Sequence, residues 1–286
     1  MTTIKQVFRI YSLMVFERIS QPRMYISFAL GIVFFLVPAM NLYHYAINLD
    51  EYINISEIFI VSMNNQHNLV FFMLGLFLLL SDAPFLSNRI THVFVRISRS
   101  TWLIAQLFYI FISSAVYVVV ITFLVSIAFI GMCYAPNVWS NPIHLLVTNP
   151  SSAIQYGISF YGAELISKYL PWQALALNLL LVTLYGTVMG FLLFTFSIFR
   201  YRLLGFIVSM GIHVIGYMIL RDAPYHANPQ LSLLVRSIPS YQFYGYPFPS
   251  TSNSIFTFIV LIVTLVTVCF QQAKKIDLCN TVGEEL

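Results

Sequence analysis

Side chains that commonly carry out chemistry are few and scattered in this sequence. Only 8% of its 286 residues are charged, and ten of these are acidic. The patterns HExxH, GxSxG and GxxxxGK[ST], which would indicate zinc hydrolysis, a serine nucleophile or nucleotide binding, do not occur. The sequence therefore predicts no catalytic residue, no metal site and no cofactor on this chain, and ATP-driven work would need a separate subunit. The six histidines are spread over different segments: His44, His67, His92, His144, His213 and His226.

His213 lies deep within a long apolar segment of the sequence. Ionisable groups inside a membrane are costly, which makes them functional candidates. We therefore regard His213 as a candidate intramembrane polar site, and one interpretation of the chain is an intramembrane enzyme that uses it together with outer-loop groups. A neutral histidine that forms a hydrogen bond to a neighbouring helix explains the residue as well.

Asp82 is the acidic residue nearest to a predicted membrane span, in the sequence SDAPF from Ser81 to Phe85. A carboxylate followed two residues later by proline is typical of a helix start, because the carboxylate caps free backbone N–H groups and proline fits the first turn. We therefore predict that Asp82 and Pro84 begin a helix that runs from about residue 83 to 99. The near absence of carboxylates from the spans also argues against ion-coupled transport.

The predicted helix over 83–99 has a basic face. Phe94 and Ile97 belong to its apolar stripe, whereas Arg96 and Arg99 lie elsewhere on its surface. Such a helix could tether the chain to the inner membrane surface, or it could insert into a cytosolic partner that pushes on it. The residue pattern leaves both interpretations open, and it makes these four side chains the candidate contacts with a partner.

Long apolar segments dominate the rest of the chain. Hydrophobic residues make up 59% of it and the mean hydropathy is +0.83, whereas charged residues make up about 25% of a soluble domain. Because about 20 helical residues cross the hydrocarbon core of a bilayer, we predict an all-α polytopic membrane protein with six transmembrane helices in a domain over 25–272. Their expected ranges are 25–46, 66–85, 102–133, 172–198, 203–220 and 254–272.

The basic residues predict the orientation of these spans. With both termini in the cytoplasm, eleven of the fourteen Lys and Arg residues lie on the inner side, and Lys168, Arg221 and Arg236 lie outside. This positive-inside bias predicts a multi-pass protein of the cell inner (plasma) membrane with a cytoplasmic tail over 273–286. The outer loops are then expected over about 47–65, 134–171 and 221–253.

The segment 1–24 is predicted to form an amphipathic helix on the inner membrane surface. Apolar residues at Ile4, Val7, Phe8, Tyr11 and Met14 follow the spacing of one helical face, and most charges lie off that face. A simpler interpretation is a basic anchor that fixes the orientation of the first span.

Gly186 and Gly190 form a GxxxG pattern in the fourth predicted span. Small residues let helix backbones approach closely in a membrane, so this pattern predicts tight helix packing. The pattern itself allows contacts within one chain or between two, and we expect contacts within the chain. The net charge of +4 on so few charged residues indicates no nucleic-acid partner.

Taken together, these features resemble the membrane subunit, or permease, of bacterial ABC-2 type ABC transporters. The resemblance rests on the basic amphipathic N-terminal helix, on six spans with both ends inside, and on a capped helix between spans two and three. Locally it rests on SDAPF from Ser81 to Phe85, on the sequence RISR from Arg96 to Arg99, and on the residues from Trp102 to Gln106. The architecture covers the whole chain, whereas this local match covers about 30 residues.

The resemblance implies a mechanism in which a separate ATPase drives the permease. The helix near 83–99 would dock into a cytosolic ABC ATPase that holds ATP and Mg, and a second permease chain, identical or paralogous, would complete the pathway in the bilayer. Spans almost free of charge suit export of a hydrophobic or amphipathic cargo such as a peptide or a lipid-like molecule. The alternatives are a non-catalytic membrane scaffold, immunity or sensor protein, and the intramembrane enzyme considered above.

Overall fold

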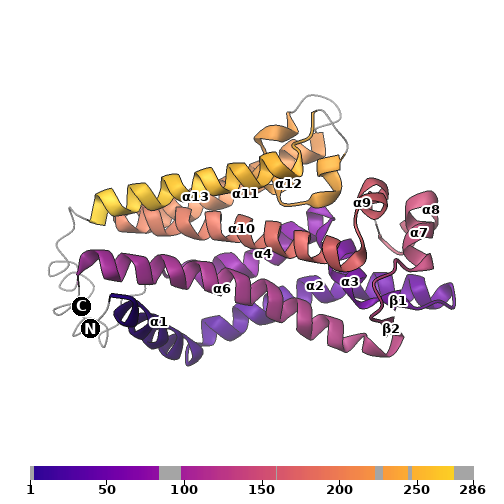
Figure 1. Ribbon diagram of the computed structural model, residues 1–286, viewed down its shortest axis with the longest axis horizontal. Coiled ribbons are helices and arrows are strands. Elements are labelled where there is room, and N and C mark those ends of the chain that lie inside the picture. The colour runs from indigo at the N-terminus through magenta and orange to yellow at the C-terminus, as the bar shows by residue number, and fades with distance from the viewer. Residues whose placement is uncertain (1–2, 84–97, 159, 223–227, 244–246, 274–286) are drawn as a thin grey trace.

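The computed structural model describes residues 3–83, 98–158, 160–222, 228–243 and 247–273 of the chain. Within these residues the molecule is an elongated bundle whose long helices run mostly along its longest axis (Figure 1). Helix α10 lies among α6, α11 and α13 and is the most buried of the long helices. The core of the bundle is therefore built around α10.

Five of the described helices are long and apolar enough to cross a membrane. At about 1.5 Å per residue, even the 20 residues of the shortest span roughly 30 Å, the thickness of a hydrocarbon core. These helices support a helical, multi-pass membrane protein. They are α2 (Pro22–Asn48), α6 (Arg99–Ala128), α10 (Pro171–Ile198), α11 (Arg202–Asp222) and α13 (Thr251–Ala273).

The second predicted span, 66–85, is shorter than expected. Helix α4 (Gln66–Leu80) has 15 residues and follows α3 (Ile55–Met63) after a bend of 94°. Asparagines stabilise the bend, because Asn64 ends α3 and the side chain of Asn65 accepts a hydrogen bond from the backbone N–H of His67 at the start of α4. The two helices together form either a broken span or a re-entrant loop.

The end of the bundle that carries the connections, which we call the loop end, contains more structure than the sequence predicted. The region 47–65, expected to be a loop, contains α3, whose residues Ser56 to Met63 are all buried. Strands β1 (Ile53–Asn54) and β2 (Cys133–Tyr134) pair in parallel beside it. The remaining elements at this end are η1 (Ile130–Met132), α7 (Asn141–Thr148), α8 (Ser151–Ile154), α9 (Ala163–Lys168), η2 (Pro229–Leu231), α12 (Leu233–Arg236) and η3 (Pro239–Phe243).

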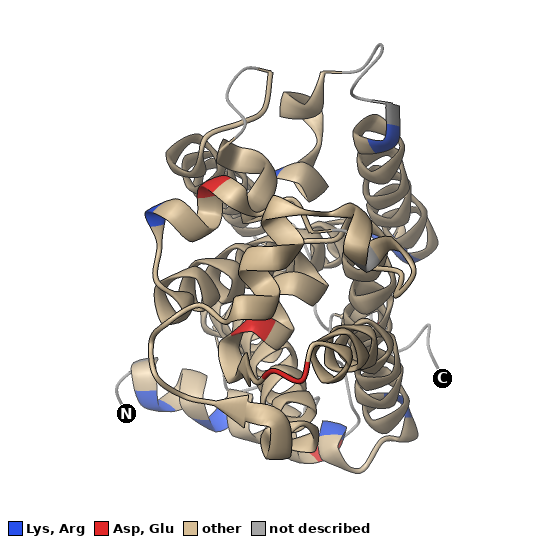
Figure 2. Cartoon of the chain, turned by 90° about the vertical axis from the view of Figure 1, so that its right-hand side faces the viewer, with Lys and Arg blue, Asp and Glu red and all other residues tan. Residues whose placement is uncertain are grey.

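Few charged residues occur on the loop end. Figure 2 views the molecule from this end and shows a ribbon that is mostly tan, with a few segments coloured as Asp, Glu, Lys or Arg. The opposite end, which we call the basic end, is where α2, α6 and α11 begin and α4 and α10 end (Figure 1). Five of the described arginines lie there: Arg18, Arg23, Arg99, Arg200 and Arg202.

The N-terminal helix α1 (Thr3–Ile19) packs against α6. The stripe expected from the sequence is only partly the buried one, because Ile10 and Met14 are buried while Ile4 and Phe8 are exposed. The apolar side of α1 is thus divided: one part contacts α6, and the other remains free to contact the bilayer. Tyr11 and Phe8 both stack edge-on against Phe108 of α6, so α1 is attached to the bundle rather than separate from it.

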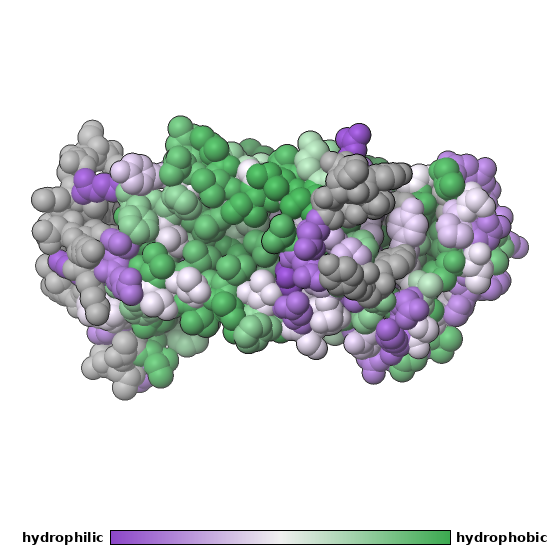
Figure 3. Space-filling model, turned by 90° about the horizontal axis from the view of Figure 1, so that it is seen from above, coloured by the Kyte–Doolittle hydropathy of each residue, from purple (hydrophilic) through white to green (hydrophobic). Residues whose placement is uncertain are grey.

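Helices α11 and α13 expose an apolar face to the surroundings. Figure 3 shows this side of the molecule, on which a green apolar band lies between more polar ends. An exposed band of this kind is expected where lipid chains surround the protein. Its exposed members include Ile207, Val214, Ile215 and Met218 of α11, and Phe256, Ile259, Val260 and Val263 of α13.

A tight turn joins α10 to α11. The backbone N–H of Tyr201 donates to the carbonyl of Phe196, and that of Arg200 donates to the carbonyl of Ser197, each at 3.0 Å. This pair of hydrogen bonds is the Schellman motif, which places one residue in the left-handed region, usually glycine. Here that residue is Arg200, with φ of 66°. A side chain at this position strains the backbone.

We expect Arg200→Gly to give a more stable protein than Arg200→Ala, by about 1 kcal/mol. Both variants lose the guanidinium, so the difference between them reports only the left-handed backbone. Thermal unfolding of the two purified variants in the same detergent measures it. Equal melting temperatures would contradict the strain at this position.

Candidate functional site

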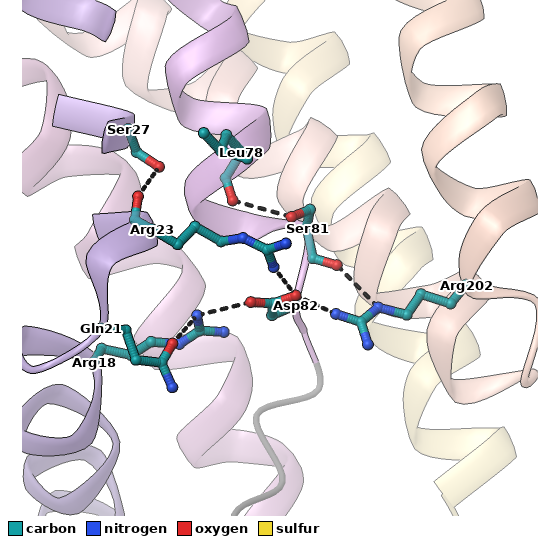
Figure 4. Close-up of polar contacts among 8 residues, drawn as sticks. All are labelled: Arg18, Gln21, Arg23, Ser27, Leu78, Ser81, Asp82 and Arg202. Carbon is teal, nitrogen blue, oxygen red and sulfur yellow. Dashed lines mark hydrogen bonds and ion pairs between the residues drawn. The ribbon is translucent and has the colours of Figure 1, made fainter. Parts of the chain in front are cut away.

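Three arginines converge on one carboxylate at the basic end (Figure 4). Oδ2 of Asp82 accepts from Nη1 of Arg18 at 3.1 Å, and Oδ1 of Asp82 pairs with Nη1 of Arg23 and with Nη2 of Arg202. Nε of Arg202 also donates to the carbonyl oxygen of Ser81, at 3.1 Å. We call Arg18, Arg23, Asp82 and Arg202 the Asp82 cluster. It connects α1, α2, the end of α4 and the start of α11.

Local structure positions each member of the Asp82 cluster. Arg18 continues the buried face of α1, four residues after Met14, and its Nη1 also donates to Oε1 of Gln21 at 2.7 Å. The turn at Gln21 leads directly into α2, so Arg23 lies in the first turn of that helix. The Schellman turn at Arg200 directs the chain into α11, of which Arg202 is the first residue.

The members of the cluster differ in exposure. The side chain of Arg18 is 7% exposed and that of Asp82 is 26% exposed, whereas Arg23 and Arg202 are 41% and 53% exposed. An ion pair screened from water is stronger than one in water. The pair of Arg18 with Asp82 is therefore the structural centre of the cluster, and Arg23 and Arg202 form its outer side.

The arginines keep Asp82 ionised. Burial by itself raises the pKa of this carboxyl, but the hydrogen bonds and charges of Arg23 and Arg18 outweigh burial and hold its pKa below the usual range. A lowered pKa means that the contribution to stability is present at every pH above the ordinary carboxyl value of about 3.9 and is lost only in more acidic solution. The cluster is thus fully charged at neutral pH.

The helix predicted over 83–99 follows Asp82 in the sequence, and most of its residues lie outside the described part of the chain. Pro84, Phe94, Arg96 and Ile97 are among these residues, as is the start of the helix that Asp82 was expected to cap. Among the described residues, Asp82 acts as the acceptor for three arginines.

Arg99 lies in a different element from the one predicted. It is the first residue of α6, so this helix begins three residues before the predicted span. Ser98 caps α6, because its Oγ accepts from the backbone N–H of Thr101 at 3.2 Å and bonds to the Thr101 hydroxyl at 2.6 Å. The segment 84–97 therefore connects two fixed points, Asp82 on one side and the capped start of α6 on the other.

Gly186 and Gly190 lie in close contact with other helices of the same chain. A Cβ atom on Gly186 would come within 2.5 Å of Leu76 in α4, and one on Gly190 would come within 2.6 Å of Ile110 in α6 and 2.7 Å of Leu80 in α4. The two glycines thus allow α10 to pack tightly against α4 and α6.

His213 bridges three helices. Its Nε2 donates to the backbone carbonyl of Val70 in α4 at 3.1 Å, which leaves Nδ1 to accept from the hydroxyl of Tyr185 in α10 at 2.5 Å. Both ring nitrogens of His213 therefore have hydrogen-bond partners within the chain. One turn further along α11, Tyr217 bonds to His67 at 2.8 Å. These hydrogen bonds link α11 to α4 and α10.

Tyr117 forms a close contact between two spans that the sequence did not indicate. The hydroxyl of this α6 residue donates to the carbonyl of Phe72 at 2.8 Å. Its ring lies where Gly31 of α2 and Gly75 of α4 leave room, because a Cβ on either glycine would overlap the Tyr117 hydroxyl. Gly31 and Gly75 lie in different spans, so no GxxxG spacing reveals them.

Glu57 organises the loop end and was also not recognised from the sequence. It is fully buried in α3, and its carboxylate accepts from the backbone N–H of Asn54 at 2.8 Å and from the backbone N–H and hydroxyl of Ser140 at 2.7 and 2.6 Å. The spacing Asn-x-x-Glu is the signal that could have revealed this helix start. The same carboxylate also fixes the start of α7 against α3.

Comparisons with known proteins add no relative. Within the described part of the chain, no group of three or more His, Cys, Asp or Glu side chains could hold a metal ion. We regard the Asp82 cluster as the candidate functional site for two reasons. Three arginines converge there on one carboxylate, and Asp82 directly precedes the segment that is predicted to contact a partner. No protein-family model, curated protein or solved structure matches this sequence.

Proposed function

We propose that the chain is the permease subunit of an ATP-driven ABC transporter of the cell inner membrane. A separate cytosolic ATPase would supply the energy, and a second permease chain, identical or paralogous, would complete the pathway. The segment 84–97, together with Arg99 at the start of α6, would be the contact with the ATPase. The chain itself would form the pathway and carry out none of the ATP chemistry.

The observation that carries this proposal is the attachment of both ends of that segment. Asp82 connects one end to α1, α2 and α11, and Ser98 fixes the other end as the cap of α6. A force applied to the segment would therefore reach five helices at once, namely α1, α2, α4, α6 and α11. Such a connection is what an ATPase needs in order to shift the spans between two arrangements.

The cargo that we propose is hydrophobic or amphipathic, such as a peptide or a lipid-like molecule, and the direction is export. The five long helices contain a single acidic residue, Asp222, which is the last residue of α11. A pathway without carboxylates offers little to a metal ion or a proton.

We expect the double variant Arg96→Glu/Arg99→Glu to lower transport at least about tenfold while ATP hydrolysis by the assembled complex continues, because repulsive charges at one contact can cost several kcal/mol. Glutamate at the first position of α6 suits the helix dipole, so the reversal leaves the span intact. Transport and ATP turnover are measured in vesicles that contain the chain and its co-purified ATPase.

The matched control is Lys168→Glu/Arg221→Glu, which reverses the same number of charges at the loop end. The control is expected to transport normally. Normal export by the Arg96→Glu/Arg99→Glu variant would contradict the proposed contact. If the chain, extracted gently from its own membrane, carries no ATPase, the scaffold, immunity or sensor interpretation is favoured instead.

A further inference from the structure

The outer side of the Asp82 cluster has more positive charge than its carboxylate neutralises. Three guanidinium groups share the single negative charge of Asp82, which leaves a net charge of +2. Arg18 is nearly buried, so the excess is presented by Arg23 and Arg202. Within the described part of the chain, the guanidinium of Arg23 forms its polar contact with Asp82, and that of Arg202 forms its polar contacts with Asp82 and the carbonyl of Ser81.

Most N–H donors of these two arginines remain available. A guanidinium has five N–H groups. Arg23 uses one of its two Nη atoms, and Arg202 uses Nε and one Nη. Both side chains are about half exposed, so the remaining donors are accessible from outside the bundle.

Exposed apolar residues follow each of the two arginines in its helix. Leu203 and Ile207 lie within five residues after Arg202 in α11 and are exposed. Tyr25 and Ile26 lie within three residues after Arg23 in α2 and are exposed as well. Arg23 and Arg202 lie in the first turns of helices that are long enough to cross a membrane. Positive charge next to exposed apolar surface, at the end of a span, matches the polar headgroup and acyl chains of one lipid molecule.

We infer that Arg23 and Arg202 bind the phosphate of an anionic phospholipid at the basic end of the bundle. A phosphate oxygen accepts charge-assisted hydrogen bonds from arginine, and a headgroup of charge −1 offsets half of the excess of +2. The acyl chains then lie along the apolar sides of α2 and α11.

The experiment measures which lipids stay bound to the purified chain. Native mass spectrometry is performed on protein exchanged into micelles with equal amounts of phosphatidylglycerol and phosphatidylcholine, and thermal unfolding is measured with each lipid separately. We expect the natural sequence to retain phosphatidylglycerol about tenfold over phosphatidylcholine. Arg23→Gln/Arg202→Gln should lose this preference, whereas Lys168→Gln/Arg221→Gln, which removes two charges at the loop end, should keep it.

Two further arms separate the possible sources of the effect. Inorganic phosphate, added to protein in phosphatidylcholine, should not raise the melting temperature; a rise equal to that with phosphatidylglycerol would overturn the lipid assignment. Arg23→Lys/Arg202→Lys keeps both charges, so it should fold and keep most of the preference even if the glutamine pair does not fold. Loss of preference in the lysine pair, or an equal loss in the loop-end control, would overturn the inference.

Discussion

Asp82→Asn is expected to destabilise the folded chain by about 2–3 kcal/mol. Removing one partner of a buried ion pair costs about 3–5 kcal/mol, and the partial exposure of Asp82 lowers that figure. Asparagine keeps the shape of the side chain but leaves three guanidinium groups without a carboxylate. The nearly buried Arg18 is affected most, because it cannot turn toward water. Unfolding of the purified variant by denaturant in mixed micelles measures the loss.

A matched control for Asp82→Asn is Glu164→Gln at the loop end. Glu164 pairs with Lys168 at 3.2 Å, but both side chains are half exposed, so the loss should be below about 0.5 kcal/mol. Equal losses for the two variants would show that burial does not strengthen the Asp82 cluster.

Double-mutant cycles test which arginine matters most. We expect the coupling energy of Asp82→Asn with Arg18→Met to be about 2 kcal/mol, and that with Arg202→Gln to be below about 1 kcal/mol. The difference follows from exposure, because Arg18 is 7% exposed and Arg202 is 53% exposed. A larger coupling to Arg202 would contradict this order.

Gly75→Ala is the second variant with a large expected effect, a loss of about 2–3 kcal/mol. The added Cβ would lie 2.6 Å from the backbone oxygen of Ser27 in α2 and would overlap the hydroxyl of Tyr117. The Tyr117 side chain can turn away only by losing its bond to Phe72, and the Ser27 backbone cannot move without shifting α2. The contact between α2 and α4 should therefore open, which is measured as a lower melting temperature.

Gly211→Ala is the control for Gly75→Ala. Gly211 lies within α11, and nothing lies within 4 Å of the place where its Cβ would be. Replacing a helical glycine by alanine at an open position should stabilise the helix by about 0.5–1 kcal/mol. The two variants are thus expected to change stability in opposite directions, and a loss for Gly211→Ala equal to that for Gly75→Ala would contradict the packing explanation.

Several elements could be predicted because their signals are local. The apolar residues of α2, α6, α10, α11 and α13 follow one another in uninterrupted runs, and the described helices lie within a few residues of the predicted ranges. The start of α1 and its apolar side also follow from spacing within 17 residues. Only part of the predicted apolar side of α1 is buried, because the packing of α1 on α6 involves Phe108 and Tyr109, which lie far away in the sequence.

The loop end was predicted less well. Residues 47–65 were interpreted as an outer loop in which Asp50, Glu51 and Glu57 lie among apolar residues. The structure forms the buried helix α3 within this region, with Glu57 bonded to Ser140, which is 83 residues away. A carboxylate that appears exposed in the sequence becomes acceptable inside the protein when distant donors surround it.

The sequence by itself indicated that this chain is a membrane protein, and it predicted the approximate number of long helices and the accumulation of arginines at one end. Each of these features depends on composition within short segments. Only the tertiary structure decided what those arginines do. Asp82 lies 64 residues from Arg18 and 120 from Arg202, so that their convergence depends on how α1, α4 and α11 pack. The same packing places Tyr117 between Gly31 and Gly75. Such contacts are set by side-chain shape and charge across helices, which no spacing within one helix encodes.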